Sequence, residues 1–275
     1  MERREIEEKV LKDMVQRGLK AALDLLVPRG CLVCGRSLEL SEEHLCCECF
    51  EDLPRTYYWL RKFNPMADRF NALIQNTLNE QSSMSHIDYA FATALFFYRD
   101  ESEYRRIPYQ IKYHGDIPAG RFFGQMFGQM IASAEHFADI DAVIPVPLHW
   151  LRHWKRGYNQ AEIIANEVAA ALGAELRTDI LERCRRTRTQ TKLSIDGKTT
   201  NVQGAFRVRA SINNSPGKSN KKAEASDITS LKHLLIIDDV FTTGNTALAC
   251  YSALRFVFPP SVRISIATLA FVGEA

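Results

Sequence analysis

Long hydrophobic runs are absent from this sequence of 275 residues. A membrane-spanning helix needs about 20 consecutive apolar residues. The longest candidate, YAFATALFFY at residues 89–98, is too short and contains tyrosine and threonine. We therefore expect no membrane insertion. The first thirty residues carry charges throughout, without an apolar core after the basic start, so we expect no secretory signal peptide and a cytoplasmic protein.

An excess of charge of one sign is also lacking. The chain has 35 lysine and arginine residues against 33 aspartate and glutamate residues, which leaves a net charge of +2. Because the whole chain is not a polycation, a site for nucleic acid or phosphate must come from a local basic cluster. Residues 183–192, RCRRTRTQTK, form such a cluster with five basic residues and no acidic one. This run fits closure over a polyphosphate, contact with a nucleic-acid backbone, or a solvated loop.

Cysteines are few outside one short segment, which argues against a disulfide framework. The chain has seven, and five of them lie between Cys31 and Cys49. The spacing Cys31-x2-Cys34, eleven residues, Cys46-x2-Cys49 is typical of four thiolates around one Zn²⁺. Such a site is closed to substrate, so we expect a structural zinc. Cys47 is an additional thiol and a weaker alternative ligand.

Hydrophobic periodicity divides the chain into segments. We expect an N-terminal amphipathic helix at 1–30, a four-cysteine zinc finger at 31–54, a linker or helical segment at 55–86 and an α/β domain at 87–275, with a polar insertion at 210–230. The expected strands are 88–98, 141–148, 234–238 and 262–271, and the expected helices are 118–137, 159–173 and 245–258. Alternating strands and helices predict a parallel sheet covered by helices on both faces.

The stretch LLIIDDVFTTGNTA at 234–247 combines a buried strand with two adjacent carboxylates. Ligands bind at the carboxyl ends of parallel strands, where Asp238 and Asp239 would lie. The next residues suit a phosphate, because hydroxyls, a glycine and a helix N-terminus supply donors; they are Thr242, Thr243, Gly244, Asn245 and Thr246. The carboxylates suit sugar hydroxyls or a hydrated Mg²⁺. The alternative is an Asp-rich turn that caps a helix through Thr246.

This stretch resembles the signature of type I phosphoribosyltransferases, which bind phosphoribosyl pyrophosphate (PRPP). It is not a Walker A loop, because no Gly-Lys-Ser/Thr is present. The resemblance implies that Asp238 and Asp239 are catalytic residues that hold the ribose hydroxyls. It also implies that residues 242–246 hold the 5-phosphate and that Mg²⁺ accompanies PRPP.

A second stretch, VIPVPLHWLRHWKRGYNQAEIIA at 143–165, offers donors for the departing pyrophosphate. We expect a strand ending at Pro147, a basic loop and a helix capped by Asn159. The pyrophosphate and Mg²⁺ side would contain Arg152, Lys155, Arg156, Gly157, Tyr158, Asn159 and Gln160. The alternative is a solvated basic loop. We expect Trp150 and Trp154 to pack on the sheet edge, with base stacking as the weaker interpretation.

Taken in order, the four-cysteine module, IKYHGD, PVPL…KRGYNQAE, RTRTQTKL…N…GAF and LLIIDDVFTTGNT resemble the ComF family. That resemblance covers residues 25–271 and implies a type I phosphoribosyltransferase-like domain with an N-terminal zinc finger. It also implies service in DNA uptake, natural competence or use of imported single-stranded DNA. Lys112 would be a further basic residue at the site. Single-stranded DNA and a competence helicase–ATPase are the implied partners.

Three hypotheses follow for function. The first is an active phosphoribosyltransferase, although no nucleobase pocket is identifiable and the acceptor is unknown. The second is a non-catalytic single-stranded DNA-binding or adaptor protein with a PRPP-sensing site, which the basic tracts and zinc module favour. The third is a zinc-stabilised adaptor with a vestigial site, against which the intact acidic pair argues. We expect a combination of the first two.

Overall fold

The computed structural model describes residues 24, 27–80, 88–184, 204–209 and 230–273. The chain forms two compact units, one of residues 1–53 with 101–107 and one of residues 54–100 with 108–275. Most of the predicted N-terminal helix at 1–30 and of the insertion at 210–230 lies outside the described residues. None of the described helices is long and apolar enough to cross a membrane.

The described part of the larger unit contains a sheet of five parallel strands. In spatial order these are β1 (Ala92–Phe97), β7 (Arg263–Phe271), β6 (His233–Phe241), β2 (Ala142–Pro145) and β3 (Glu175–Leu176). The four predicted strands are confirmed, while β3, with only two residues, is too short to be recognised in the sequence. A further two-stranded antiparallel sheet pairs β4 (Leu181–Arg183) with β5 (Phe206–Val208).

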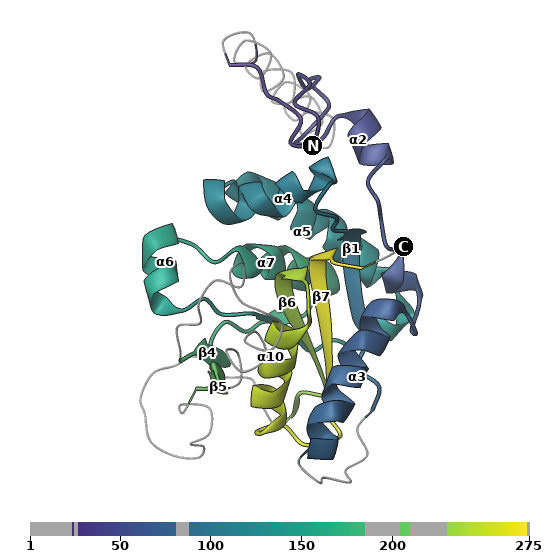
Figure 1. Ribbon diagram of the computed structural model, residues 1–275, viewed down its shortest axis with the longest axis vertical. Coiled ribbons are helices and arrows are strands. Elements are labelled where there is room, and N and C mark those ends of the chain that lie inside the picture. The colour runs from purple at the N-terminus through teal and green to yellow at the C-terminus, as the bar shows by residue number, and fades with distance from the viewer. Residues whose placement is uncertain (1–23, 25–26, 81–87, 185–203, 210–229, 274–275) are drawn as a thin grey trace, which may run out of the picture. The chain divides into compact units, whose positions relative to one another are not determined.

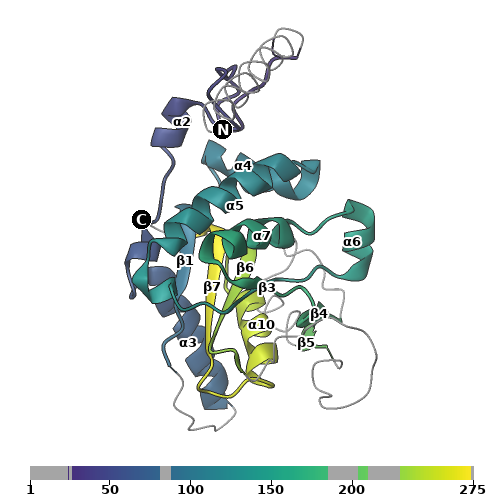
Figure 2. The same cartoon turned by 180° about the vertical axis from the view of Figure 1, so that it is seen from behind.

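Helices cover both faces of the parallel sheet, as predicted (Figures 1 and 2). One face carries α5 (Ile117–Ala132) and α7 (Gln160–Leu172), and the other carries α3 (Pro65–Glu80) and α10 (Asn245–Arg255). Helix α5 ends earlier than predicted and is followed by the 3-10 turn η4 (Glu135–Phe137). The segment expected as a linker or short helices contains α3, which has sixteen residues.

Helices α5 and α7 approach closely because α5 presents glycines to its neighbour. A Cβ at Gly124 would lie 3.1 Å from the Cβ of Glu167, and one at Gly128 would lie 2.8 Å from the Cβ of Ala171. The large side chains of Phe123, Phe127 and Ile131 in the same helix are fully buried. The glycines of α5 thus allow the close contact with α7, and its phenylalanines fill the buried core.

Strand β6 lies between β7 and β2, which explains its continuous apolar run. The side chains of Leu234, Leu235, Ile236 and Ile237 are all fully buried. A strand covered on both faces has no polar side, so its sequence does not alternate. In the register, Ile237 is level with Pro145, the last residue of β2, and Asp238 is level with Thr268 of β7. The acidic pair therefore begins where the neighbouring strand β2 ends.

At the opposite, amino end of β6, His233 is fully buried in a polar chain. Its Nδ1 lies 2.7 Å from Oδ1 of Asp139, and its Nε2 lies 2.8 Å from Oγ of Ser265. A carboxylate can only accept, so the neutral ring donates from Nδ1 and accepts from the serine hydroxyl. Ser265 is itself fully buried. No substrate can reach the Ser265 hydroxyl, so it does not act as a nucleophile. Its hydrogen bond with His233 instead joins β7 to β6.

The hydrogen-bonded row of Asp139, His233 and Ser265 leads us to predict that the stability of the protein depends on pH. Burial lowers the pKa of His233 in spite of Asp139, so the folded protein binds fewer protons here than the unfolded chain does. Stability from this site is present above the unfolded pKa of about 6.5 and is lost as the pH falls below it. In urea titrations at pH 7.5 and 5.5, wild type should lose more free energy of unfolding than His233→Gln. The exposed His153→Gln variant should behave as wild type; an identical loss in all three would contradict the assignment.

Candidate functional site

Two features of the structure are candidates for function, and the first is the four-cysteine cluster of the smaller unit. The sulfur atoms of Cys31, Cys34, Cys46 and Cys49 all lie within 4.8 Å of one another, and those of Cys34 and Cys46 are 3.7 Å apart. Zinc–sulfur bonds of about 2.3 Å in a tetrahedron separate sulfurs by about 3.8 Å. The donor set therefore fits a closed metal site. Cys47 is exposed and lies outside the cluster.

The ionisation of these thiols also fits a bound cation. Burial raises the pKa of Cys31, but backbone N–H donors from the two cysteine knuckles, residues 31–35 and 45–49, outweigh burial and lower it to about 7. Burial and the neighbouring thiols raise the pKa of Cys49. A thiolate at Cys49 is therefore unfavourable unless a positive charge lies beside it. A bound divalent metal supplies that charge.

A segment far along the chain supports the cysteine module, and the sequence analysis did not identify it. Residues 101–107 belong to the smaller unit and include the 3-10 turn η2 (Glu103–Arg105). The hydroxyl of Tyr104 donates to the carbonyl of Cys49, and Arg106 donates to the carbonyl of Val33. One segment therefore fastens both knuckles. A tyrosine and an arginine in a polar segment give no sequence signal for such contacts.

The second feature is the acidic pair at the carboxyl end of β6. The Asp239 side chain is 7% exposed, and its Oδ2 lies 3.3 Å from Nζ of Lys112 and 3.4 Å from Nε2 of Gln160. Its Oδ1 accepts from the backbone N–H of Val240, and Oδ1 of Asp238 accepts from that of Asp239. The sequence predicted Lys112 and Gln160 as site residues, and the structure brings both to the same carboxylate.

The two carboxyl groups have opposite pKa shifts. Burial and the adjacent negative charge of Asp239 raise the pKa of Asp238 well above its ordinary value. Burial also acts to raise that of Asp239, but the ammonium of Lys112 outweighs it and lowers the pKa. The pair therefore retains a proton more readily than two isolated carboxyl groups would. A cation or a set of hydroxyl donors is the complement that this arrangement favours.

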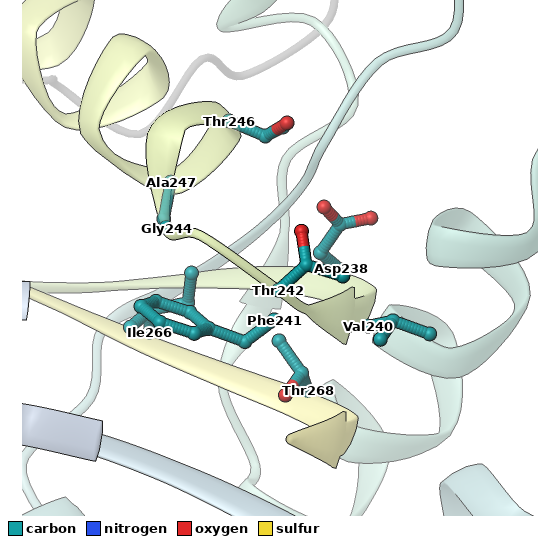
Figure 3. Close-up of a pocket in the computed structure, with 9 residues that line it drawn as sticks. All are labelled: Asp238, Val240, Phe241, Thr242, Gly244, Thr246, Ala247, Ile266 and Thr268. Atoms are coloured by element: carbon teal, nitrogen blue, oxygen red, sulfur yellow. The ribbon is translucent and has the colours of Figure 1, made fainter. Parts of the chain in front are cut away.

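Asp238 borders a pocket with the loop that follows β6, shown in Figure 3. Thr242, Gly244 and Thr246 line the same pocket, whereas Thr243 and Asn245 are not among its lining residues. Gly244 has a φ of 84° and precedes α10, which has no side-chain N-cap. Thr246 therefore does not cap the helix, contrary to the alternative interpretation. Among the described residues, no N-cap side chain accepts from the first N–H groups of α10, as an anion site requires.

The stretch after β2 differs from the prediction. Strand β2 ends at Pro145 rather than Pro147, and Arg152, Lys155 and Arg156 lie in a helix, α6 (Trp150–Arg156), rather than in a loop. The helix has seven residues and an N-terminal cap from His149, whose ring accepts from the N–H of Leu151. So short a helix shows no apolar periodicity, and the sequence alone therefore predicts a loop.

Trp150 and Trp154 do not pack on the sheet edge, because they are 68% and 80% exposed. Asn159 caps α7 as predicted, and its amide also donates to the carbonyl of Val146. Gly157 ends α6 with a φ of 80°. The loop between the two helices is therefore fixed at both ends.

Polar contacts link this stretch to the acidic pair. Arg156 donates to Oε1 of Gln160 at 2.5 Å, and Gln160 contacts Asp239. The hydroxyl of Tyr158 donates to the carbonyl of Ile111 at 2.6 Å, next to Lys112 in the π-helical turn η3 (Gln110–His114). Two distant motifs thus meet at one carboxylate.

Arg183 is the first residue of the basic run 183–192, and the sequence gives no sign of where it lies. The structure places it on β4. Its guanidinium lies 5.0 Å from the centre of the Phe206 ring. Burial and the nearby charge of Arg152 lower its pKa, and the charge of Asp238 opposes this. The charge of Asp238 therefore acts on Arg183, and Arg152 is a second positive charge close to Arg183. The rest of the run, residues 185–192, lies outside the described residues.

Comparisons with known proteins identify relatives for part of the chain. Competence protein F of Haemophilus influenzae is 33% identical over 115 residues, which are 42% of this chain and 44% of that protein. DNA utilization protein YhgH is 32% identical in Salmonella typhimurium and 30% identical in Escherichia coli K12, each over 106 residues, 38% of this chain and 39% of the relative. The chain spans less than half the length of these relatives. No family model matches it.

Among solved structures, the adenine phosphoribosyltransferase of Trypanosoma brucei in complex with AMP, pyrophosphate and ribose-5-phosphate has a TM-score of 0.31 and 12% identity. The aligned residues cover 78% of this chain and 84% of the trypanosomal enzyme's chain. The resemblance to ComF-type proteins is confirmed by the sequence relatives. The predicted fold class is confirmed as a parallel α/β sheet with helices on both faces and a four-cysteine cluster.

Proposed function

From the relationship to competence protein F and the DNA utilization proteins, we propose that this chain is a PRPP-binding, phosphoribosyltransferase-like protein. It would serve DNA uptake, natural competence or the use of imported single-stranded DNA. The observation that carries the proposal is that the two adjacent carboxylates at the end of β6 have different surroundings. Asp238 borders a pocket lined by loop hydroxyls, while Asp239 is held by Lys112 and Gln160.

A ribose 5-phosphate group is the ligand that suits both halves of this site. Carboxylates repel a phosphate, but they accept hydrogen bonds from the vicinal hydroxyls of a sugar. The uncapped start of α10 and the hydroxyls of Thr242 and Thr246 supply donors, as a phosphate requires. One ligand with hydroxyls at one end and a phosphate at the other satisfies both sets of groups.

The same arrangement suits transfer from PRPP. The bond from C1 of the ribose to the pyrophosphate oxygen breaks, pyrophosphate leaves with the electron pair, and a nucleophile of the acceptor forms the new bond to C1. Positive charge that develops at the ribose ring is stabilised by the carboxylates. Lys112, Arg156 and Arg152 contribute donors on the pyrophosphate side. Mg²⁺, when bound with PRPP, would neutralise the charge of the leaving group.

The four-cysteine cluster has a structural role in this proposal. Four protein ligands leave no open coordination position, so the metal cannot bind substrate while they remain bound. Zinc is the metal that such a donor set favours. Its function is to hold the two knuckles and the segment 101–107 together within the smaller unit.

A second candidate function is a non-catalytic single-stranded DNA-binding or adaptor protein that uses the site to sense PRPP. The two exposed tryptophans of α6 favour it, because they share that helix with Arg152 and Arg156, and exposed aromatic and basic residues together bind single strands. Fluorescence anisotropy with labelled oligothymidine tests this role. A competence helicase–ATPase is the partner that this role would involve.

The site can be tested by titrating Mg²⁺–PRPP into the wild-type protein and its carboxylate variants by calorimetry. A hydrogen bond to a charged group contributes about 1.5–3 kcal/mol, so Asp238→Asn and Asp239→Asn should each lower the affinity roughly 10- to 150-fold. The exposed Asp88→Asn variant should bind as wild type does. Failure of a folded wild type to bind, or equal affinity in all variants, would contradict the proposal.

A further inference from the structure

An exposed pair of tyrosines lies beside the acidic site and has no role in the proposed function so far. Tyr109 and Tyr113 are 53% and 56% exposed, and their ring centres are 4.9 Å apart at an angle of 45°. The ring of His114 lies 5.4 Å from that of Tyr109. Large aromatic side chains left half in solvent, in contact with one another, offer flat surface to a ligand.

Two cations flank one of these rings. The guanidinium carbon of Arg156 lies 5.6 Å from the ring centre of Tyr113, and Nζ of Lys112 lies 5.8 Å from it. Lys112 contacts Asp239 directly, and Arg156 reaches it through Gln160. Both cations beside the Tyr113 ring are therefore linked to the carboxylate of Asp239, Lys112 directly and Arg156 through Gln160. A ring stacked on Tyr113 would lie next to the ribose position.

The local backbone holds this arrangement in place. Lys112 and Tyr113 lie in the π-helical turn η3, which ends at Gly115 with a φ of 72°. The carbonyl of Ile111 in the same turn accepts from Tyr158. Single π-helical turns are rare and occur frequently at functional sites. The tyrosines are thus presented from a fixed turn rather than from a free loop.

The chemistry of these groups identifies the class of ligand. Aromatic faces stack planar rings, and such stacking tolerates any base because every base has a π-face. A nucleobase-type heterocycle is therefore the ligand that two exposed tyrosine rings favour, while Lys112 and Arg156 keep their place on the pyrophosphate side. In the transfer reaction the acceptor nucleophile must lie beside C1 of the ribose, which the carboxylates of Asp238 and Asp239 would anchor.

We propose that Tyr109 and Tyr113, flanked by Arg156 and Lys112, form the subsite that stacks the heterocyclic ring of the acceptor. This inference rests on the proposed function. The ring has two possible sources, a free nucleobase or a base within a single DNA strand, and both present the same stacking face. The subsite is distinct from the pocket lined by Thr242, Gly244 and Thr246, which takes the phosphate.

The test measures base binding by calorimetry on protein saturated with ribose 5-phosphate, which lacks the pyrophosphate leaving group and so cannot react with the base. The ligands are hypoxanthine, adenine and uracil in one arm, and a ten-residue oligothymidine in the other. Stacking contributes about 1–3 kcal/mol per base, so Tyr113→Ala should weaken binding roughly 5- to 150-fold. Tyr113→Phe, which keeps the ring, should retain most of the affinity. Phe256→Ala, which removes an aromatic side chain that is 89% exposed elsewhere, should have no effect.

The outcomes separate this inference from the proposed function. Loss in the first arm identifies a free base, and loss only in the second identifies a base within a strand; either supports the subsite. Equal base or oligonucleotide affinity in wild type and Tyr113→Ala would overturn it, as would absence of binding in both arms. Mg²⁺–PRPP affinity, measured on the same variants, should change less than about twofold, since stacking needs no contact with the phosphate. If wild type binds no PRPP, the proposed function itself fails.

Discussion

Cys46→Ser should release the metal and unfold the smaller unit, whereas Cys47→Ser should do neither. Cys46 is fully buried and its sulfur lies 3.7 Å from that of Cys34, while Cys47 is exposed and outside the cluster. A structural zinc site contributes an apparent binding free energy of about 10–16 kcal/mol in small modules. The free energy lost with one ligand should therefore exceed what the small apolar core of this unit contributes to its stability.

The measurement combines metal content with hydrogen exchange. Wild type and Cys47→Ser should contain one zinc per chain and protect the backbone amides of residues 30–52. Cys46→Ser, or wild type treated with a chelator, should contain none and lose that protection. Stoichiometric metal and normal protection in Cys46→Ser, with loss in Cys47→Ser, would show that the neighbouring thiol is the true ligand.

Gly244→Ala should damage both stability and PRPP binding. The residue has a φ of 84°, and an added Cβ would lie 2.6 Å from Cδ1 of Leu73 and 2.7 Å from Cζ of Phe241. The tip of Leu73 can move, but the Phe241 ring is buried against Phe70 and Phe271. The left-handed backbone costs roughly 1–2 kcal/mol and overpacking roughly 1–3 kcal/mol. We expect a loss of about 2–5 kcal/mol in the free energy of unfolding.

Gly173→Ala is the matched control, because Gly173 also has a positive φ of 65° but no atom within 4 Å of an added Cβ. It lies at the end of α7, away from the loop. It should lose only the backbone share of stability and keep its affinity for PRPP, while Gly244→Ala should bind at least tenfold more weakly. Equal stability and equal binding in the two variants would contradict the close packing assigned to the loop. Urea unfolding and calorimetry measure both quantities.

The sequence predicted those parts of the fold whose signals are local. The apolar run of β6, the two cysteine pairs and the Asn159 cap each depend on a few adjacent residues, and each has the structure expected of it. The acidic pair was predicted to lie at the carboxyl end of a strand, because parallel strands place ligand sites there. Lys112 and Gln160 were assigned to the site through the family resemblance, and the structure supplies their common contact, Asp239.

The parts that were missed depend on long-range contacts or on short elements. Helix α6 has too few residues for periodicity, so its basic residues were interpreted as a loop and its tryptophans as packed on the sheet. Tyr104 supports a cysteine more than fifty residues earlier in the chain. The contacts of Tyr113 with Lys112 and Arg156 require the π-helical turn and the last turn of α6 to meet. No local pattern encodes such meetings.

A crystal structure with Mg²⁺ and PRPP bound would test the central claim most directly. We expect the 5-phosphate at the start of α10, within hydrogen-bonding distance of Thr242 or Thr246 and the backbone at Gly244. The ribose hydroxyls should contact Asp238 and Asp239, and the pyrophosphate should extend toward Lys112 and Arg156. Density for PRPP at another place on the protein, or an empty site at saturating ligand with the metal module intact, would contradict the ribose-phosphate assignment.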